Sequence, residues 1–86
     1  MATKREELTN PNECLAKVAD EEPIFILRAT DKLAPHLVRL WAAMVVREHM
    51  EGWASGALPT EKLTRALKCA LSMEAWQAQH GGKVPD

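Results

Sequence analysis

Apolar residues repeat at helical spacing throughout the second half of the chain. The first repeat runs from Pro35 to about Glu51 and the second from Pro59 to His80. A spacing of three and four places these side chains on one face of a helix. Proline suits the first turn of a helix and glycine the residue after its end, so Pro35 and Pro59 predict the two starts and Gly81 the second stop. The repeating positions are Leu37, Leu40, Trp41, Met44 and Val45, then Leu63, Ala66, Leu67, Ala70, Leu71 and Ala75.

The first half predicts two shorter helices. Asn10, Pro11 and Glu13 combine an N-cap side chain, a proline at the first helical position and a capping-box acid, so we expect a helix from Asn10 to about Asp20. A second short helix is predicted from about Glu22 to Ala29. Its β-branched Ile24 and Ile26 also suit an extended segment, which leaves the conformation of residues 23–28 open.

These elements predict an all-α fold, a compact bundle of about four helices, with two short helices followed by two longer ones. Residues 10–82 would form the single domain. Residues 1–9 are charged and lack helical spacing, which predicts a flexible arm, and residues 83–86 predict a flexible tail.

The composition favours self-association. The chain has 86 residues, of which 47% are hydrophobic, and a helical chain this short has a small core. Apolar surface left over can be buried between copies, so we expect a homodimer or a larger oligomer. The candidate contacts are Trp53, in a glycine-flanked loop, and a second apolar stripe on the last helix formed by Cys69, Met73 and Trp76.

The charge pattern argues against nucleic acid as a partner. Eleven basic and twelve acidic side chains give a formal charge of −1, so no overall field attracts a polyanion. Lys62, Arg65 and Lys68 recur every three residues and are interpreted as a solvated face. A helix-turn-helix from Pro35 to His80 would present an apolar recognition helix with few groups for base edges.

Polar residues interrupt the densest apolar run, at the junction before the helix that begins at Pro35. Arg28, Asp31, Lys32 and His36 gather there, close to the free N–H groups of a helix start, which can hold a phosphate. Trp41 or Phe25 would supply a stacking plane for a base. The structural alternative is that Arg28 pairs with Asp31, or with the acidic run Asp20 to Glu22, and simply fixes the turn.

Catalytic and metal-binding patterns are not found. His36, His49 and His80 are widely separated, and neither serine lies in a nucleophile motif, so we expect no metal, no cofactor and no enzyme activity. Cys14 and Cys69 are interpreted as small buried apolar groups. We expect the protein to occupy a reducing compartment. No stretch approaches the ~20 apolar residues that span a bilayer, and no apolar leader begins the chain, so a bacterial cytoplasmic location is expected.

Two segments carry a resemblance: DEEPIFILRATDKLAPHLVRLWAAMVV, from residue 20, and KLTRALKCALSMEAWQ, from residue 62. They resemble small helical accessory proteins encoded in phage and prophage genomes, over most of residues 12–77. The resemblance implies a mobile-element protein acting in a bacterial host, where such proteins bind and disable a host factor or sequester a signalling molecule. It implies no catalytic residue.

The first functional hypothesis is therefore a non-catalytic accessory protein that binds and inhibits or modulates a host protein. The second is an oligomeric binder that sequesters a phosphate-bearing nucleotide signal, in the manner of an anti-defence protein, through Arg28, Lys32 and the neighbouring helix start. A small DNA-binding regulator is the third.

Overall fold

The chain is helical, and two long helices dominate it. A computed structural model describes residues 2–52 and 56–83 and gives, in chain order, α1 (Lys4–Thr9), the 3₁₀ helix η1 (Cys14–Lys17), α2 (Ala34–Met50) and α3 (Thr60–His80). Within those residues there is no strand, only an isolated parallel bridge between Asp31 and Lys83. The all-α prediction is confirmed, with three α-helices in the described residues rather than four.

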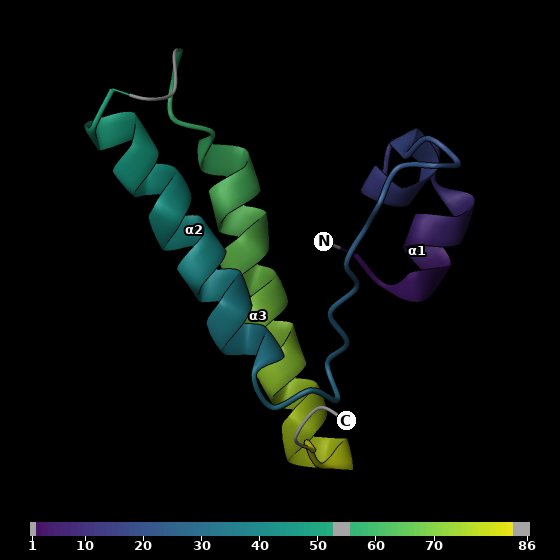
Figure 1. The fold of residues 1–86 in the computed structure, drawn as a ribbon. Coiled ribbons are helices and arrows are strands. Elements are labelled where there is room, and N and C mark those ends of the chain that lie inside the picture. The colour runs from purple at the N-terminus through teal and green to yellow at the C-terminus, as the bar shows by residue number, and fades with distance from the viewer. Residues whose placement is uncertain (1, 53–55, 84–86) are drawn as a thin grey trace.

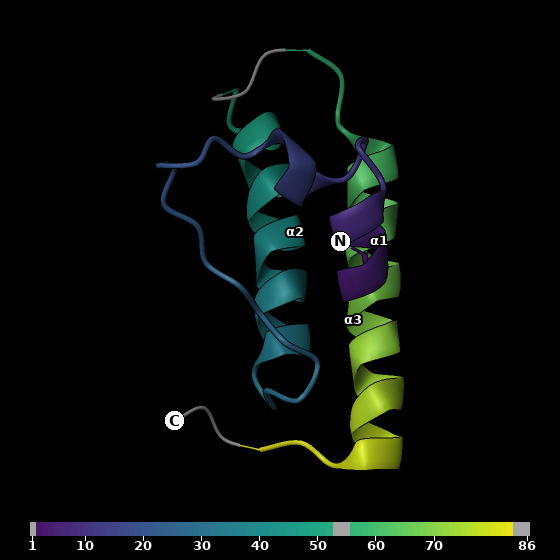
Figure 2. The ribbon, with the colours of Figure 1, turned by 90° about the vertical axis from the view of Figure 1, so that its right-hand side faces the viewer.

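Helices α2 and α3 lie side by side as an antiparallel hairpin (Figure 1, Figure 2). Small side chains at four-residue spacing form the seam: Val38 and Ala42 from α2 meet Ala66 and Ala70 from α3, with Leu63 beside them. Alanine leaves room for two helix backbones to approach closely, and the resulting contacts exclude water along the seam. The core of the protein is therefore narrow, and most of the larger apolar side chains lie outside it.

Both long helices were predicted within a residue or two. Pro35 occupies the first turn of α2, where its missing N–H costs no helical hydrogen bond. At the far end of α3, Gly81 has φ of +78°, a conformation that L side chains rarely adopt, and its N–H donates to the carbonyl of Gln77. Proline and glycine therefore act at the positions where the sequence predicted a start and a stop.

The predicted helix from Asn10 to Asp20 is wrong except for the single 3₁₀ turn of η1. Asn10 ends α1, because its N–H donates to the carbonyl of Glu6 at 2.9 Å, and its side-chain oxygen accepts from the N–H of Asn12 in a local turn. Glu13 does not reach back to cap a helix. Its carboxylate is buried and bound by Arg65 of α3, at 3.0 and 3.2 Å.

Residues 1–9 contain a helix that the prediction of an arm lacked. Thr3 caps α1: its hydroxyl accepts from the N–H of Glu6 at 3.2 Å, and the Glu6 carboxylate accepts from the N–H of Thr3 at 3.3 Å. The Glu7 carboxylate accepts from the N–H of Leu15 at 2.9 Å and so joins α1 to η1. No residue of α1 is buried, which is why apolar spacing gave no sign of it.

The predicted helix from Glu22 to Ala29 is also wrong, because residues 22–28 belong to no helix and Figure 1 shows them as a drawn-out, extended chain. β-Branched Ile24 and Ile26 favour that conformation. Leu27 packs against the core between α2 and α3, which anchors the segment on the hairpin. Figure 1 shows this segment, in blue, running beside the hairpin from η1 to the start of α2, with no neighbouring strand.

The whole molecule is open rather than the compact bundle expected. Figure 1 and Figure 2 place α1 and η1 to one side of α3, joined to the hairpin by the extended segment. The Cα radius of gyration is 14.3 Å, against ~12 Å for a compact chain of this length. Of the predicted tail, only Lys83 belongs to the described residues, and its backbone pairs with Thr30 and Lys32.

Candidate functional site

The turn before α2 carries the predicted ligand residues, and its own carboxylate occupies the helix start. The Asp31 carboxylate accepts from the N–H of Leu33 at 2.8 Å, and the Asp31 carbonyl accepts from the N–H of Ala34 at 3.1 Å. The bond to the carboxylate closes a local turn at Leu33, the N-cap residue of α2, and it does not cap the N–H groups of the helix itself. A negative charge at this helix end still disfavours an external phosphate there, so anion binding has to depend on basic side chains instead.

Gln77 of α3 holds this turn in place, and the sequence analysis missed it. Its side-chain amide donates to the carbonyl of Ala29 at 2.9 Å and to the carbonyl of Asp31 at 2.7 Å. Two backbone bonds add to this: Lys32 N–H to the Lys83 carbonyl at 3.0 Å, and Lys83 N–H to the Thr30 carbonyl at 2.8 Å. The residues before α2 and after α3 are thereby joined at one end of the hairpin.

A shallow depression of about 270 Å³ lies at this joined end. Its lining comes from two distant parts of the sequence: Arg28 and Thr30 before α2, and His80, Gly81, Gly82 and Lys83 after α3. The Lys32 side chain borders it, because a Cβ added at Gly82 would lie 3.0 Å from Lys32 Cγ. The depression is thus lined by two basic residues, Arg28 and Lys83, with a third, Lys32, at its border, and by glycine backbone.

An aromatic pair stands beside the depression. The rings of Trp76 and His80 are stacked, with centroids 3.9 Å apart and an angle of 17° between their planes. The His80 ring nitrogen Nδ1 also lies 3.2 Å from the Trp76 carbonyl. Trp76 remains 47% exposed, so the pair offers flat aromatic surface next to the basic side chains.

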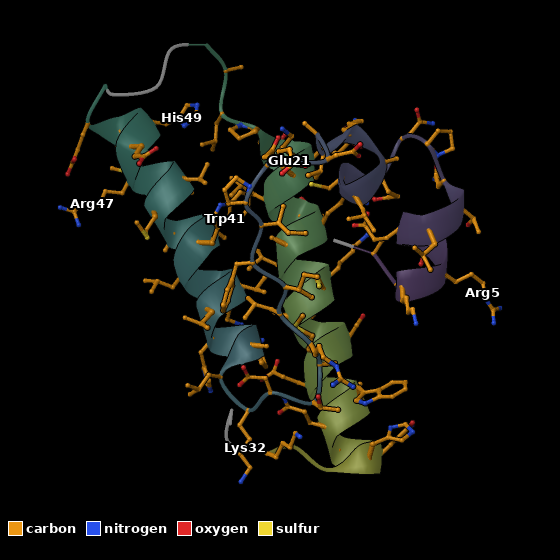
Figure 3. All side chains as sticks on the ribbon, turned by 45° about the vertical axis from the view of Figure 1, so that its right-hand side comes forward. Arg5, Glu21, Lys32, Trp41, Arg47 and His49 are labelled. Atoms are coloured by element: carbon orange, nitrogen blue, oxygen red, sulfur yellow. The ribbon has the colours of Figure 1, made fainter. Side chains whose placement is uncertain are left out.

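Two of the predicted ligand residues lie apart from this depression. Trp41 is midway along α2, whereas Lys32 precedes the helix, and Figure 3 shows the two well separated. His36 is exposed on the first turn of α2, near enough to Glu74 for its charge to act on that carboxylate. A hydrogen bond from Arg39, with smaller help from the charges of Arg39 and His36, lowers the pKa of Glu74. Arg28 lines the depression and the Lys32 side chain borders it, whereas Trp41 and His36 are not among the lining residues.

The predicted interface residues divide in a similar way. Met73 is half-buried and packs against the core, and Cys69 is also half-buried. Trp76 is exposed and takes part in the aromatic pair. Trp53 lies outside the described residues. Within the predicted stripe on α3, Met73 packs inside the subunit, whereas Trp76 is exposed and could contact a second copy.

The basic stripe of α3 is partly neutralised. Arg65 binds the buried carboxylate of Glu13, and this hydrogen bond, reinforced by the Glu13 charge, raises the pKa of Arg65. Lys62 and Lys68 are left as exposed charges on the same helix. Across residues 2–52 and 56–83, no group of three or more His, Cys, Asp or Glu side chains is arranged to hold a metal ion, and both cysteines are free thiols.

Neither long helix suits a bilayer. In the part of the chain that the structure describes, no helix has both the length and the apolar character needed to cross a membrane.

Comparison with known proteins finds no matching family model, no matching curated protein and no matching solved structure. The assignment of function therefore depends on the geometry described above.

Proposed function

We propose that the protein is a non-catalytic binding protein that holds a phosphate-bearing nucleotide at the joined end of the hairpin. The observation that carries this proposal is the convergence of Arg28, Lys32 and Lys83 on one depression that also contains glycine backbone. Guanidinium and ammonium groups are the side chains that bind phosphate most strongly, and guanidinium can bind it through two hydrogen bonds. Among residues 2–52 and 56–83, Arg28 has no ion-pair partner.

The aromatic pair suits the other part of a nucleotide. A base would stack on the face of the Trp76 indole that His80 does not cover, and His80 itself lines the depression. Stacking of this kind contributes ~1–3 kcal/mol per base where it has been measured in nucleic-acid complexes. A shallow, solvent-open site gives modest affinity, so a high copy number would let such a protein sequester a signal rather than transform it.

The setting comes from the resemblance to phage-encoded accessory proteins. A host cell that signals with nucleotides would be countered by a protein that removes them from solution. This function needs no catalytic group, and it agrees with the second hypothesis drawn from the sequence.

Differential scanning fluorimetry and calorimetry at ~50 mM salt would test the proposal. The panel comprises cyclic, linear and dinucleotide compounds and inorganic phosphate. We expect at least one nucleotide to raise Tm, and Arg28→Ala to reduce its affinity roughly 10-fold or more, since hydrogen bonds to charged groups contribute ~1.5–3 kcal/mol. Arg47→Ala is the matched control, because Arg47 is exposed and pairs with Glu51 at the other end of α2. A panel without any Tm shift contradicts the proposal.

A second candidate function, binding of a host protein, is supported by exposed apolar side chains on the hairpin. Leu40, Met44 and Leu71 are 56%, 53% and 61% exposed. Leu40 and Met44 lie one turn apart on α2, and Leu71 lies on α3. Large apolar side chains exposed on a surface are typical of protein contacts. Affinity capture from a bacterial lysate with the native chain and with Leu71→Glu would test it. A partner retained by the native chain and lost by the variant supports this function; equal capture by both contradicts it.

A further inference from the structure

The extended segment from Ile24 to Leu27 has no hydrogen-bond partner for its backbone within the described residues. Its side chains are equally unpartnered at three positions: Ile24, Phe25 and Ile26 are 50%, 84% and 70% exposed. Extended backbone with free N–H and C=O groups is a template for pairing with another strand. Leu27 fixes one end of the segment on the hairpin, so the segment is already ordered for such pairing.

The sequence of this segment is complementary to itself when it is reversed. Residues 22–28 read Glu-Pro-Ile-Phe-Ile-Leu-Arg, with an acid at one end, a base at the other and Ile-Phe-Ile in the middle. In an antiparallel pair centred on Phe25, Glu22 lies opposite Arg28 of a second copy, and Ile24 lies opposite Ile26. Opposite charges and β-branched or aromatic pairs are the cross-strand combinations that stabilise a sheet.

We propose that two copies of this chain associate through antiparallel pairing of their 22–28 segments about a twofold axis at Phe25. With Phe25 in a non-hydrogen-bonded pair, each Ile24 and Ile26 exchange both N–H···O bonds across the axis. Pro23 then falls opposite Leu27 in a non-hydrogen-bonded position, where its missing N–H costs nothing. In this register Glu22 pairs with Arg28, the isoleucines pair with each other, and Pro23 lies where no N–H is needed.

The exposed surface is large enough to support such a contact. The chain exposes 6973 Å², whereas a compact monomer of its mass exposes roughly 5,100 Å². A stable interface takes ~800 Å² from each partner. An isolated two-stranded ribbon is marginal in water, but here each strand lies along a folded hairpin.

This pairing goes beyond the nucleotide site and shares only Arg28 with it. A guanidinium carries donors on more than one edge, so it can meet a carboxylate of the second copy and a phosphate at the same time. The tests below use no nucleotide. A monomeric protein that still binds nucleotide would overturn the pairing alone, and a dimer that binds none would overturn the nucleotide site alone.

Charge reversal with measurement of mass by light scattering tests the electrostatic part. The native chain should have about twice its monomer mass of 9.6 kDa. Glu22→Arg and Arg28→Glu should each shift the dissociation midpoint at least 10-fold toward higher concentration, and the double reversal should restore the native midpoint. Lys68→Glu, which reverses an exposed charge on α3, should leave the midpoint unchanged. A double reversal no better than either single variant overturns the proposal.

Cross-linking tests the register. On the proposed axis two Phe25 Cα atoms lie ~4.5 Å apart, within the ~4.4–6.8 Å of a disulfide. In a chain with Cys14→Ser and Cys69→Ser, Phe25→Cys should therefore form a covalent dimer under mild oxidation. Met50→Cys is the matched control, because Met50 is 83% exposed, as Phe25 is at 84%. Equal cross-linking of the two variants, or none for Phe25→Cys, overturns the register.

Discussion

At the scale of single residues, Gln77 has the largest consequence for the candidate site. The turn before α2 has two part-buried carbonyls, those of Ala29 and Asp31, and the Gln77 amide donates to both. Position 77 also continues the buried stripe of α3 that contains Ala66, Ala70 and Met73. A polar residue on an apolar stripe was the signal available in the sequence, because such residues are retained where they satisfy buried polar groups.

Replacing this amide should destabilise the protein. Gln77→Leu keeps the volume and the helix but leaves two half-buried carbonyls without their donor, which costs about 1–3 kcal/mol. The free energy of unfolding, measured by urea denaturation, should fall by that amount.

Gln79→Leu is the control, because Gln79 lies on the same helix and is exposed. Equal stability of the two variants would contradict the role of Gln77.

The basic residues of the site were only partly predictable. Arg28 and Lys32 lie in an apolar run where charge is conspicuous, and the sequence analysis selected both. Lys83 and His80 come from the far end of the chain. They join the site through the pairing of Lys83 with Thr30 and Lys32, a tertiary contact that has no local sequence signal.

At the scale of elements, long helices were predictable and short ones were not. Helices α2 and α3 have an apolar face, and the hairpin buries part of it, so periodicity identifies them. Helix α1 has no buried residue, so apolar periodicity cannot identify it, and it begins at the capping box of Thr3 and Glu6. Asn10 and Glu13 form a plausible capping box in sequence, but Asn10 ends α1 and Glu13 binds Arg65 in the fold. Local signals of this kind are decided by tertiary contacts.

The cap of α1 makes its stability depend on pH. Hydrogen bonds from the Thr3 side chain and backbone lower the pKa of Glu6 below its ordinary value of 4.5. A depressed carboxyl pKa stabilises the folded form above the unfolded pKa, and this contribution is lost as pH falls through the folded pKa. We therefore expect α1 to fray as the pH falls below the ordinary Glu value and through the lowered pKa of Glu6, seen as loss of its amide protection by NMR.

Thr3→Ala should move the Glu6 titration midpoint upward, toward 4.5. The variant removes the Thr3 hydroxyl that donates to the Glu6 carboxylate and so weakens the cap. Thr64→Ala is the control: the Thr64 hydroxyl donates to the Thr60 carbonyl on α3 and does not touch Glu6. An unchanged Glu6 midpoint in Thr3→Ala would show that the capping box does not set this pKa.

At the scale of the whole molecule, stability is unevenly distributed. The buried apolar side chains belong to the α2–α3 seam, with Leu27 of the extended segment packed against it. The α1–η1 unit has no buried apolar residue among its helices, and the ion pair between Glu13 and Arg65 is its described polar link to the hairpin. Segments with few buried apolar contacts open at lower free energy than the core.

Native-state hydrogen exchange should therefore resolve two levels of protection. Amides of Ala42, Ala66 and Ala70 should exchange only on global unfolding, whereas those of α1 should exchange through local opening that is much less sensitive to denaturant. Arg65→Ala should remove the partner of the buried Glu13 carboxylate and raise exchange in η1 before it affects the seam. Lys62→Ala, one turn earlier on α3, should change neither level. If the amides of α1 and of the seam exchanged with one common free energy, the two units would unfold together. That result would contradict the predicted local opening of α1.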